Sequence, residues 1–265
     1  MNNLTLLLLI ANTNIFAAMG KFAHDTITPL KNSSLSKKEQ VADMFDSIAF
    51  RYDFLNRFLS AGIDIWWRKK AIKQIASLKP KQVLDVATGT ADVALMTYDA
   101  LKPEKITGID ISEGMLDLGR KKIAARGLEN SIQLFTGDSE NIGFADNTFD
   151  AVTVSFGVRN FQNLSKGLEE MKRVLKPGGK LVVLEFSKPK NSLFKGFYNL
   201  YMNQIAPGFG KMFAKNKDAY QYLNDSVQAF PEGNRFLGIM QESGFTQTYL
   251  QSLTFGICTI YCGIK

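Results

Sequence analysis

The chain has 265 residues, of which 45% are hydrophobic and 22% charged. These proportions are typical of a globular protein and exclude a disordered chain, a collagen and a coiled-coil rod. Its longest apolar run, near residues 4–11, is shorter than the roughly 18 residues that a membrane span needs, so we expect at most peripheral membrane contact. A net charge of +7 fits either ordinary solubility or attraction to nucleic acid or lipid headgroups.

The first 36 residues are expected to form a mobile N-terminal extension, followed by a single domain over residues 37–265. Residues 4–10 resemble the apolar part of a signal peptide. A signal peptide usually begins with a positively charged residue, but no Lys or Arg precedes this run. Met19 offers an alternative first residue. We therefore interpret residues 1–18 as a start-site extension in preference to a secretion signal.

Cysteine and histidine are too scarce for a disulfide scaffold or a zinc site. Cys258 and Cys262 are four residues apart in a predicted strand. That spacing separates their α-carbons by roughly 13 Å, whereas a disulfide needs less than about 7 Å. The single histidine, His24, lies in the polar extension, so we expect no bound metal. Unpaired thiols favour a reducing compartment, and we expect a cytoplasmic protein.

From residue 36 onward the sequence alternates between helical and extended patterns. Ser36 and Glu39 form a capping-box pattern at the start of a helix, and a second amphipathic stretch begins near Asp64. Strands are expected at residues 82–87, 105–109, 131–135, 149–155, 180–186, 246–253 and 255–264. Further helices are expected from about residue 91, at 112–126, at 164–175 with a stop at Pro177-Gly178-Gly179, across an aromatic and lysine-rich section at 192–230, and shortly before Gly244.

This alternation predicts an α/β protein with a doubly wound, mostly parallel seven-stranded sheet, added N-terminal helices and a helical insertion after the fifth strand. Ligands bind such sheets at the carboxyl ends of the strands. The loop after the first strand, 85–92, has small residues that let a nucleotide approach, although a plain strand-to-helix turn would look alike. From Gly89 the G-x-G-x-x-G pattern has Ala at both later glycine positions, which disfavours NAD.

Acidic residues follow the next two strands. Asp110 ends the second strand, where a carboxylate can accept hydrogen bonds from both ribose hydroxyls, or can cap the following helix. Asp138 and Ser139 follow the third strand, where the acid can accept from an adenine amino group or initiate a turn. NAD and S-adenosylmethionine both contain an adenosine ribose, so these residues indicate an adenosine site without selecting the cofactor.

Six segments together give the sequence a specific resemblance. They are residues 45–56, 67–68, 146–150, 155–160, 173–179 and 184–189, of which Ser155–Asn160 and Leu184–Pro189 are the narrowest signals. From about residue 37 to residue 265 the sequence resembles the menaquinone/ubiquinone biosynthesis C-methyltransferases, a family of class I S-adenosylmethionine-dependent methyltransferases. It departs from that family at Thr88 and Ala91, where members often carry Gly.

The resemblance implies S-adenosylmethionine as the cofactor. Asp110 would bind its ribose, Asp138 and Ser139 would flank its adenine, and Thr90 and Ser155 would lie nearer its methionine end. The implied reaction transfers a methyl group to a ring carbon of a polyprenylated hydroquinone, converting demethylmenaquinol to menaquinol. Related enzymes also methylate a ubiquinol precursor, and methylation of another small molecule stays open.

We expect Arg159 and Asn160 to carry the catalysis. A ring carbon becomes nucleophilic when the neighbouring hydroxyl ionises, and a nearby cation lowers the pKa of such a hydroxyl from about 10. Arg159 is the candidate cation and Asn160 the residue that orients the acceptor oxygen; the alternative for Arg159 is a structural ion pair. Tyr52 and Asp53 are expected to close the pocket.

The expected partners are the quinol and the membrane surface that holds it. Aromatic residues at helical spacing suit either a helix in the lipid interface or one packed on the sheet. They lie in the same section as Lys188, Lys190, Lys195, Lys211, Lys215 and Lys217. An RNA-binding protein is the non-enzyme alternative, but the sequence carries no RNA-binding motif, and we expect no nucleic acid partner. A homodimer stays open.

Overall fold

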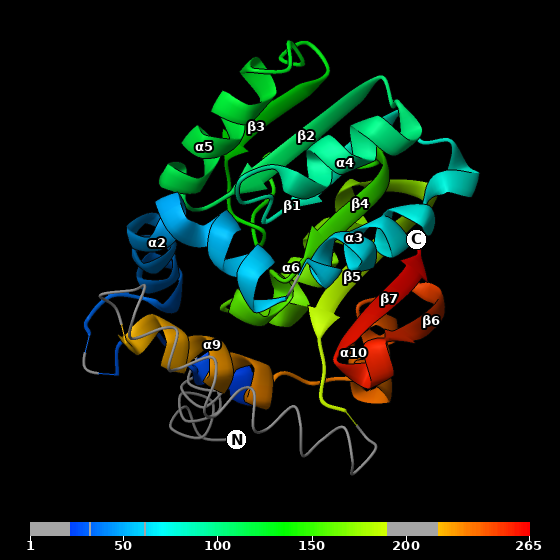
Figure 1. The fold of residues 1–265 in the computed structure, drawn as a ribbon. Helices are drawn as coiled ribbons and strands as arrows, with labels where there is room; N and C mark the ends of the chain where they lie inside the picture. Colours follow the sequence, from blue (N-terminus) through cyan, green and yellow to red (C-terminus); the bar gives the residue numbers. More distant parts are fainter. Residues whose placement is uncertain (1–21, 32, 61, 190–216) are drawn as a thin grey trace, which may run out of the picture.

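The computed structural model describes residues 22–31, 33–60, 62–189 and 217–265. Its centre is a seven-stranded sheet with the strand order β3-β2-β1-β4-β5-β7-β6 (Figure 1). Within the described residues β7 alone runs against its neighbours, β5 and β6, so the sheet is mostly parallel, as predicted. The strands are β1 Gln82–Val86, β2 Lys105–Asp110, β3 Ile132–Thr136, β4 Phe149–Ser155, β5 Leu175–Phe186, β6 Thr246–Leu253 and β7 Cys258–Ile264.

Helices cover both faces of the sheet (Figure 1). They are α2 Lys37–Leu59, α3 Ile63–Lys73, α4 Asp92–Leu101, α5 Glu113–Ala124, α6 Leu164–Val174, α9 Lys217–Ala229 and α10 Asn234–Glu242. Side chains of α3, α4 and α5 join one buried cluster, which includes Trp67 and the free thiols of Cys258 and Cys262. Side chains of α6 and α10, such as Leu168 and Met240, join a second cluster on the other face. The expected helical section at 192–230 lies largely outside the described residues, which include its last part as α9.

Local sequence signals set the start of two helices. The Ser36 N–H donates to the Glu39 carboxylate at 2.7 Å and the Glu39 N–H donates to Ser36 Oγ at 3.3 Å, which confirms the capping box of α2. Ser112 caps α5 by accepting the Met115 N–H at 3.2 Å. The Ser112 hydroxyl also donates to Asp46 Oδ1 at 2.6 Å, and this contact ties α2 to the start of α5 at the carboxyl edge of the sheet.

The Pro177-Gly178-Gly179 segment lies within β5. We had predicted that it would separate the helix from the strand, and it does not. The helix α6 ends at Val174, and β5 begins directly with Leu175 opposite Phe149. Pairing with β4 then shifts and resumes at Lys180 opposite Ala151. Between these points the Gly178 N–H donates to the Lys265 carbonyl at 3.2 Å, and the Lys265 N–H donates to the Gly179 carbonyl at 3.0 Å. Gly178 and Gly179, which lie between the two paired parts of β5, therefore bind the backbone of Lys265.

The described part of the N-terminal segment packs on the domain, which differs from the mobile extension that we expected. Residues Ala23–Thr26 form a short 3-10 helix, η1, in which His24 is completely buried. The imidazole contacts the Phe230 ring edge-on, with centroids 5.6 Å apart, and the Lys37 ammonium donates to the His24 carbonyl at 2.6 Å. The polar local sequence gave no sign of this packing, because the aromatic partner comes from the far end of the chain.

Acid should destabilise the protein through His24. Burial, together with the positive charges of Lys37 and Arg235, lowers the pKa of His24 from 6.5 to about 3. Below pH 6.5 the unfolded chain binds a proton that the folded chain does not. The free energy of unfolding therefore decreases as the pH is lowered. We expect urea titrations at pH 7 and 5.5 to differ by about 1.3 kcal/mol more in the wild type than in a His24→Gln variant. Equal pH dependence in the two proteins would contradict a buried, neutral imidazole.

Candidate active site

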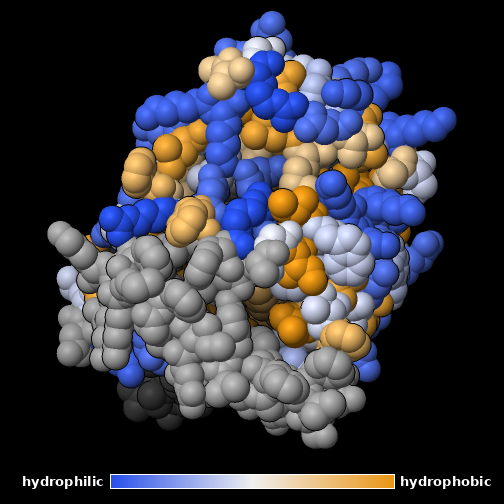
Figure 2. Space-filling model, in the orientation of Figure 1, coloured by the Kyte–Doolittle hydropathy of each residue, from blue (hydrophilic) through white to orange (hydrophobic). Residues whose placement is uncertain are grey.

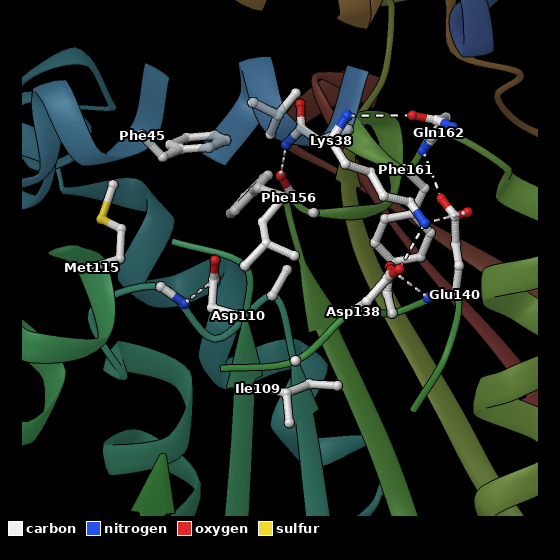
Figure 3. A pocket seen from close by; sticks show the side chains of 18 of the residues that line it. Lys38, Phe45, Ile109, Asp110, Met115, Asp138, Glu140, Phe156, Phe161 and Gln162 are labelled. Atoms are coloured by element: carbon white, nitrogen blue, oxygen red, sulfur yellow. Dashed lines mark hydrogen bonds and ion pairs between the residues drawn. The ribbon is translucent and has the colours of Figure 1, made fainter. Parts of the chain in front are cut away.

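The carboxyl ends of β1, β2, β3 and β4 border a pocket whose other wall is α2 (Figure 3). The space between the lining atoms, including the part open to solvent, is about 680 Å³, which is in the range of small-molecule sites. The lining combines acidic side chains with apolar and aromatic ones. The acids are Asp110, Asp138 and Glu140, and the apolar residues include Phe45, Met115, Phe156 and Phe161.

Asp110 lies at the end of β2 and is held by backbone donors. Its Oδ2 accepts the Gly89 N–H at 2.8 Å, and its Oδ1 accepts the Ser112 N–H at 2.9 Å. Burial raises the pKa of this carboxyl, although these backbone N–H groups oppose the rise. Each oxygen retains a second acceptor position after these contacts. The position therefore suits a pair of ligand hydroxyl groups.

Asp138 pairs with a cation that the sequence analysis missed. Its Oδ1 accepts the Glu140 N–H at 2.8 Å, and its Oδ2 lies 2.7 Å from the ammonium nitrogen of Lys38. The same nitrogen lies 2.8 Å from Glu140 Oε2, so Lys38 reaches from the first turn of α2 to two acids of the pocket (Figure 3). Ser139 also lines this part of the pocket. The capping-box pattern at Ser36 and Glu39 described only the helix start and gave no sign of the contact.

A smaller hollow adjoins the pocket and contains Thr90. Four residues line both spaces: Tyr52, Ala87, Gly89 and Ser155. The Thr90 hydroxyl donates to Asp53 Oδ1 at 2.6 Å and accepts from the Lys122 ammonium at 2.9 Å. Lys122 also pairs with Asp53 at 2.5 Å and with Asp92 at 2.8 Å. These contacts join α2, α4 and α5 around the hollow.

Arg159, which we expected beside the acceptor oxygen, lines neither space. It is 3% exposed; its Nη1 lies 2.5 Å from Glu185 Oε1 and donates to the Phe156 carbonyl at 2.7 Å. The structure has the ion pair that was the alternative, because Glu185 of β5 supplies the anion that a buried guanidinium needs. Asn160 does line the pocket, and its Oδ1 accepts from the Tyr222 hydroxyl at 3.1 Å.

Comparison with known proteins gives the family of the chain. A model of the ubiE/COQ5 methyltransferase family matches residues 33–265. The chain belongs to this family. It is 45% identical over 244 residues to a demethylmenaquinone methyltransferase of Bacteroides fragilis, which covers 92% of this chain and 99% of the relative. It is 48% identical over 231 residues to the ubiquinone/menaquinone biosynthesis C-methyltransferase UbiE of Geotalea daltonii, which covers 86% of this chain and 97% of the relative.

Solved structures place the ubiE/COQ5 chain in a widespread fold. Phosphoethanolamine N-methyltransferase 2 of Haemonchus contortus, in complex with S-adenosyl-L-methionine, matches with a TM-score of 0.64 at 14% identity. The match covers 89% of this chain and 61% of that chain. At this identity the likeness concerns the fold, and it confirms the predicted Rossmann-like class I methyltransferase architecture.

The β1–α4 loop accommodates Thr88 and Ala91, the two positions at which the resemblance led us to expect Gly. The Thr88 hydroxyl donates to Asp85 Oδ2 at 2.7 Å. Its side chain has room because residue 108 is Gly, where an added Cβ would lie 2.9 Å from Thr88 Cγ2. Ala91 has a φ of 64°, in the left-handed region that favours Gly, at a cost of roughly 1 kcal/mol. The loop therefore accommodates both side chains.

Proposed function

We propose that the chain methylates demethylmenaquinol to menaquinol, with S-adenosylmethionine as the methyl donor. The observation that carries the proposal is the 45% identity to a relative named demethylmenaquinone methyltransferase, over 99% of that relative. The pocket supports it, because its lining has acids that suit the polar groups of adenosine and aromatic residues that suit the rings of the adenine and of an acceptor.

The residues around the pocket fit the parts of this cofactor. Asp110 binds the ribose hydroxyls, Asp138 and Ser139 flank the adenine, and Thr90 and Ser155 lie at the methionine end. Among the described residues Arg68 Nε and Arg159 Nε are both buried donors without a partner, but only Arg68 also lines the smaller hollow, as expected for a site that a ligand completes. When bound, the cofactor supplies a methyl group already activated by a sulfonium.

The protein has to bind and orient the acceptor ring and exclude water, and orientation alone can lower a barrier by roughly 7–11 kcal/mol. Phe45, Tyr52 and Phe156 supply the apolar lining for the ring, and Asn160 orients its oxygen. Arg159 acts indirectly, through the position of Asn160. Because it binds both Glu185 and the Phe156 carbonyl, it fixes the turn that presents Asn160 to the pocket.

The quinone content of cells tests the proposal. Cells that lack this protein should accumulate demethylmenaquinone and regain menaquinone when the wild-type gene is restored, but not when an Asp110→Ala allele is restored. Accumulation of a ubiquinone precursor would instead assign the chain to the ubiquinol reaction. An unchanged quinone profile would overturn the proposal.

We also propose peripheral membrane contact, since the prenyl tail of the acceptor resides in the bilayer. In the described part of the chain, none of the helices combines the length and apolarity of a membrane span. Exposed aromatic side chains support contact with a lipid interface: Phe50 of α2 is 90% exposed and Trp66 of α3 is 44% exposed. Hydrophobic residues also reach the surface on the face shown in Figure 2. The lysine cluster expected to bind lipid lies mostly at 190–216, outside the described residues.

Removing lysine charge should weaken binding to anionic vesicles. The variant changes Lys190, Lys195, Lys211 and Lys215 to Gln, and its affinity should fall by up to about 1,000-fold at low salt, because each lysine contributes up to about 1 kcal/mol. Activity on a short-chain, soluble acceptor should persist. The matched control changes four exposed lysines of the described part, Lys79, Lys102, Lys121 and Lys166. Vesicle sedimentation measures the affinity of both variants. An equal loss of affinity in the two variants, or no loss in either, would show that the lysine cluster does not bind the membrane.

A further inference from the structure

The smaller hollow has a charged wall beyond the residues assigned so far. This wall is formed by Arg68 of α3, Asp92 at the start of α4 and Asp85 of β1. Arg68 is only 6% exposed, so its guanidinium group is withdrawn from solvent. The guanidinium carbon lies 5.8 Å from the centroid of the Phe156 ring, which also lines the main pocket. Arg68 therefore lies close to the junction of the two spaces.

The contacts of Arg68 leave one edge of its guanidinium without an acceptor. Its Nη1 lies 2.6 Å from Asp64 Oδ2 and 3.4 Å from Asp92 Oδ2. Its Nε is buried and has no hydrogen-bond partner among the residues that the structure describes. Buried donors are rarely left unpaired in folded proteins, and a guanidinium edge matches a carboxylate in shape and charge. The unpaired edge indicates a ligand with a carboxylate.

The ion-paired groups around Arg68 are balanced in charge before any ligand binds; Asp85 of the same wall lies outside these pairs and accepts from the Thr88 and Thr153 hydroxyls. A chain of ion pairs links three cations with three acids: Arg57, Arg68 and Lys122 with Asp53, Asp64 and Asp92. A free anion would leave this set with an excess negative charge. A group that carries both a carboxylate and an ammonium would add none. The α-amino acid end of S-adenosylmethionine is such a group.

We propose that Arg68 binds the α-carboxylate of the methionine part of the cofactor through the Nε edge of its guanidinium. This inference rests on the proposed use of S-adenosylmethionine, and it extends the site from the adenosine to the amino acid. Asp64 is a positioning residue, because it holds the Nη1 side of the same guanidinium. Asp92, on the same wall, is placed for the ammonium group of the amino acid.

Two ligands that differ only in the carboxylate test the assignment. Calorimetry on the purified, full-length protein should show S-adenosylmethionine binding about 10- to 100-fold more tightly than decarboxylated S-adenosylmethionine. In Arg68→Gln this ratio should fall to nearly one, because the affinity for S-adenosylmethionine falls and that for the decarboxylated ligand stays within about threefold. Arg68→Lys should keep part of the ratio, since it keeps the charge.

The control variant is Arg57→Gln, which alters the same ion-pair chain at a residue that lines neither space, and it should keep the wild-type ratio. An Arg68→Gln variant that weakens both ligands equally would show a structural role and overturn the assignment. Equal affinity for the two ligands in the wild type would overturn it without any variant, so the test does not depend on whether Arg68→Gln folds. Absence of S-adenosylmethionine binding would instead overturn the proposed function, and the assignment with it.

Discussion

Asp110→Ala should lose most of its affinity for S-adenosylmethionine while the protein stays folded. The carboxylate of Asp110 is held by the N–H groups of Gly89 and Ser112 and retains an acceptor position on each oxygen. Two hydrogen bonds to a charged acceptor contribute about 1.5–3 kcal/mol each. We therefore expect a loss of about 100- to 10,000-fold in affinity, measured by calorimetry.

An exposed acid on the helix that follows Asp110 provides the control. Asp117 lies on α5 with 60% of its side chain exposed, and Asp117→Ala should bind the cofactor as the wild type does. A thermal melt of both variants separates lost binding from lost fold. Unchanged affinity in Asp110→Ala would refute the ribose assignment.

Arg159→Met should destabilise the protein by about 3–5 kcal/mol, because it leaves the Glu185 carboxylate buried without its cation. Glu185 is completely buried, and burial raises the pKa of its carboxyl, whereas the charge of Arg159 opposes that rise. Chemical denaturation measures the loss. A variant as stable as the wild type would show that the pair contributes nothing to the fold.

The double variant Arg159→Met with Glu185→Leu separates the fold from the reaction. Replacing both members of a buried pair by apolar residues is often neutral for stability, so the double variant should recover most of the loss. Its turnover should still fall far more than its cofactor affinity, because Met at 159 cannot donate to the Phe156 carbonyl and the turn that carries Asn160 is released. Wild-type turnover in a stable double variant would remove Arg159 from the mechanism.

The central strands of the sheet were predictable because they are buried on both faces. Every residue of Leu181–Leu184 in β5 is buried, as is every residue from Val83 to Val86 in β1, and both strands were identified from such runs. The bounds of β4 and β6 were predicted to the residue. Predictions that depended on distant contacts were wrong. The Pro177-Gly178-Gly179 segment binds the backbone of Lys265, and the segment around His24 packs on Phe230.

The site was predictable to the extent that it follows from strand ends. Asp110 and Asp138 line the pocket because the carboxyl ends of neighbouring parallel strands share an edge. Lys38 and Arg68 come from helices outside this α/β alternation, and no local pattern showed which strand end they would reach. The ion-pair partner of Arg159 could not be predicted from the sequence for a related reason. Glu185 stands among the apolar residues of β5, and only the pairing of strands brings it to the end of β4.

The strand that completes the sheet is the last to be synthesised. β7 lies between β5 and β6, so both lack their shared partner until β7 has been synthesised. Until then the apolar β5 has an unpaired edge, which is a template for pairing with other chains. The domain can therefore close only after β7 has been synthesised, and the nascent protein is most prone to aggregate before that point.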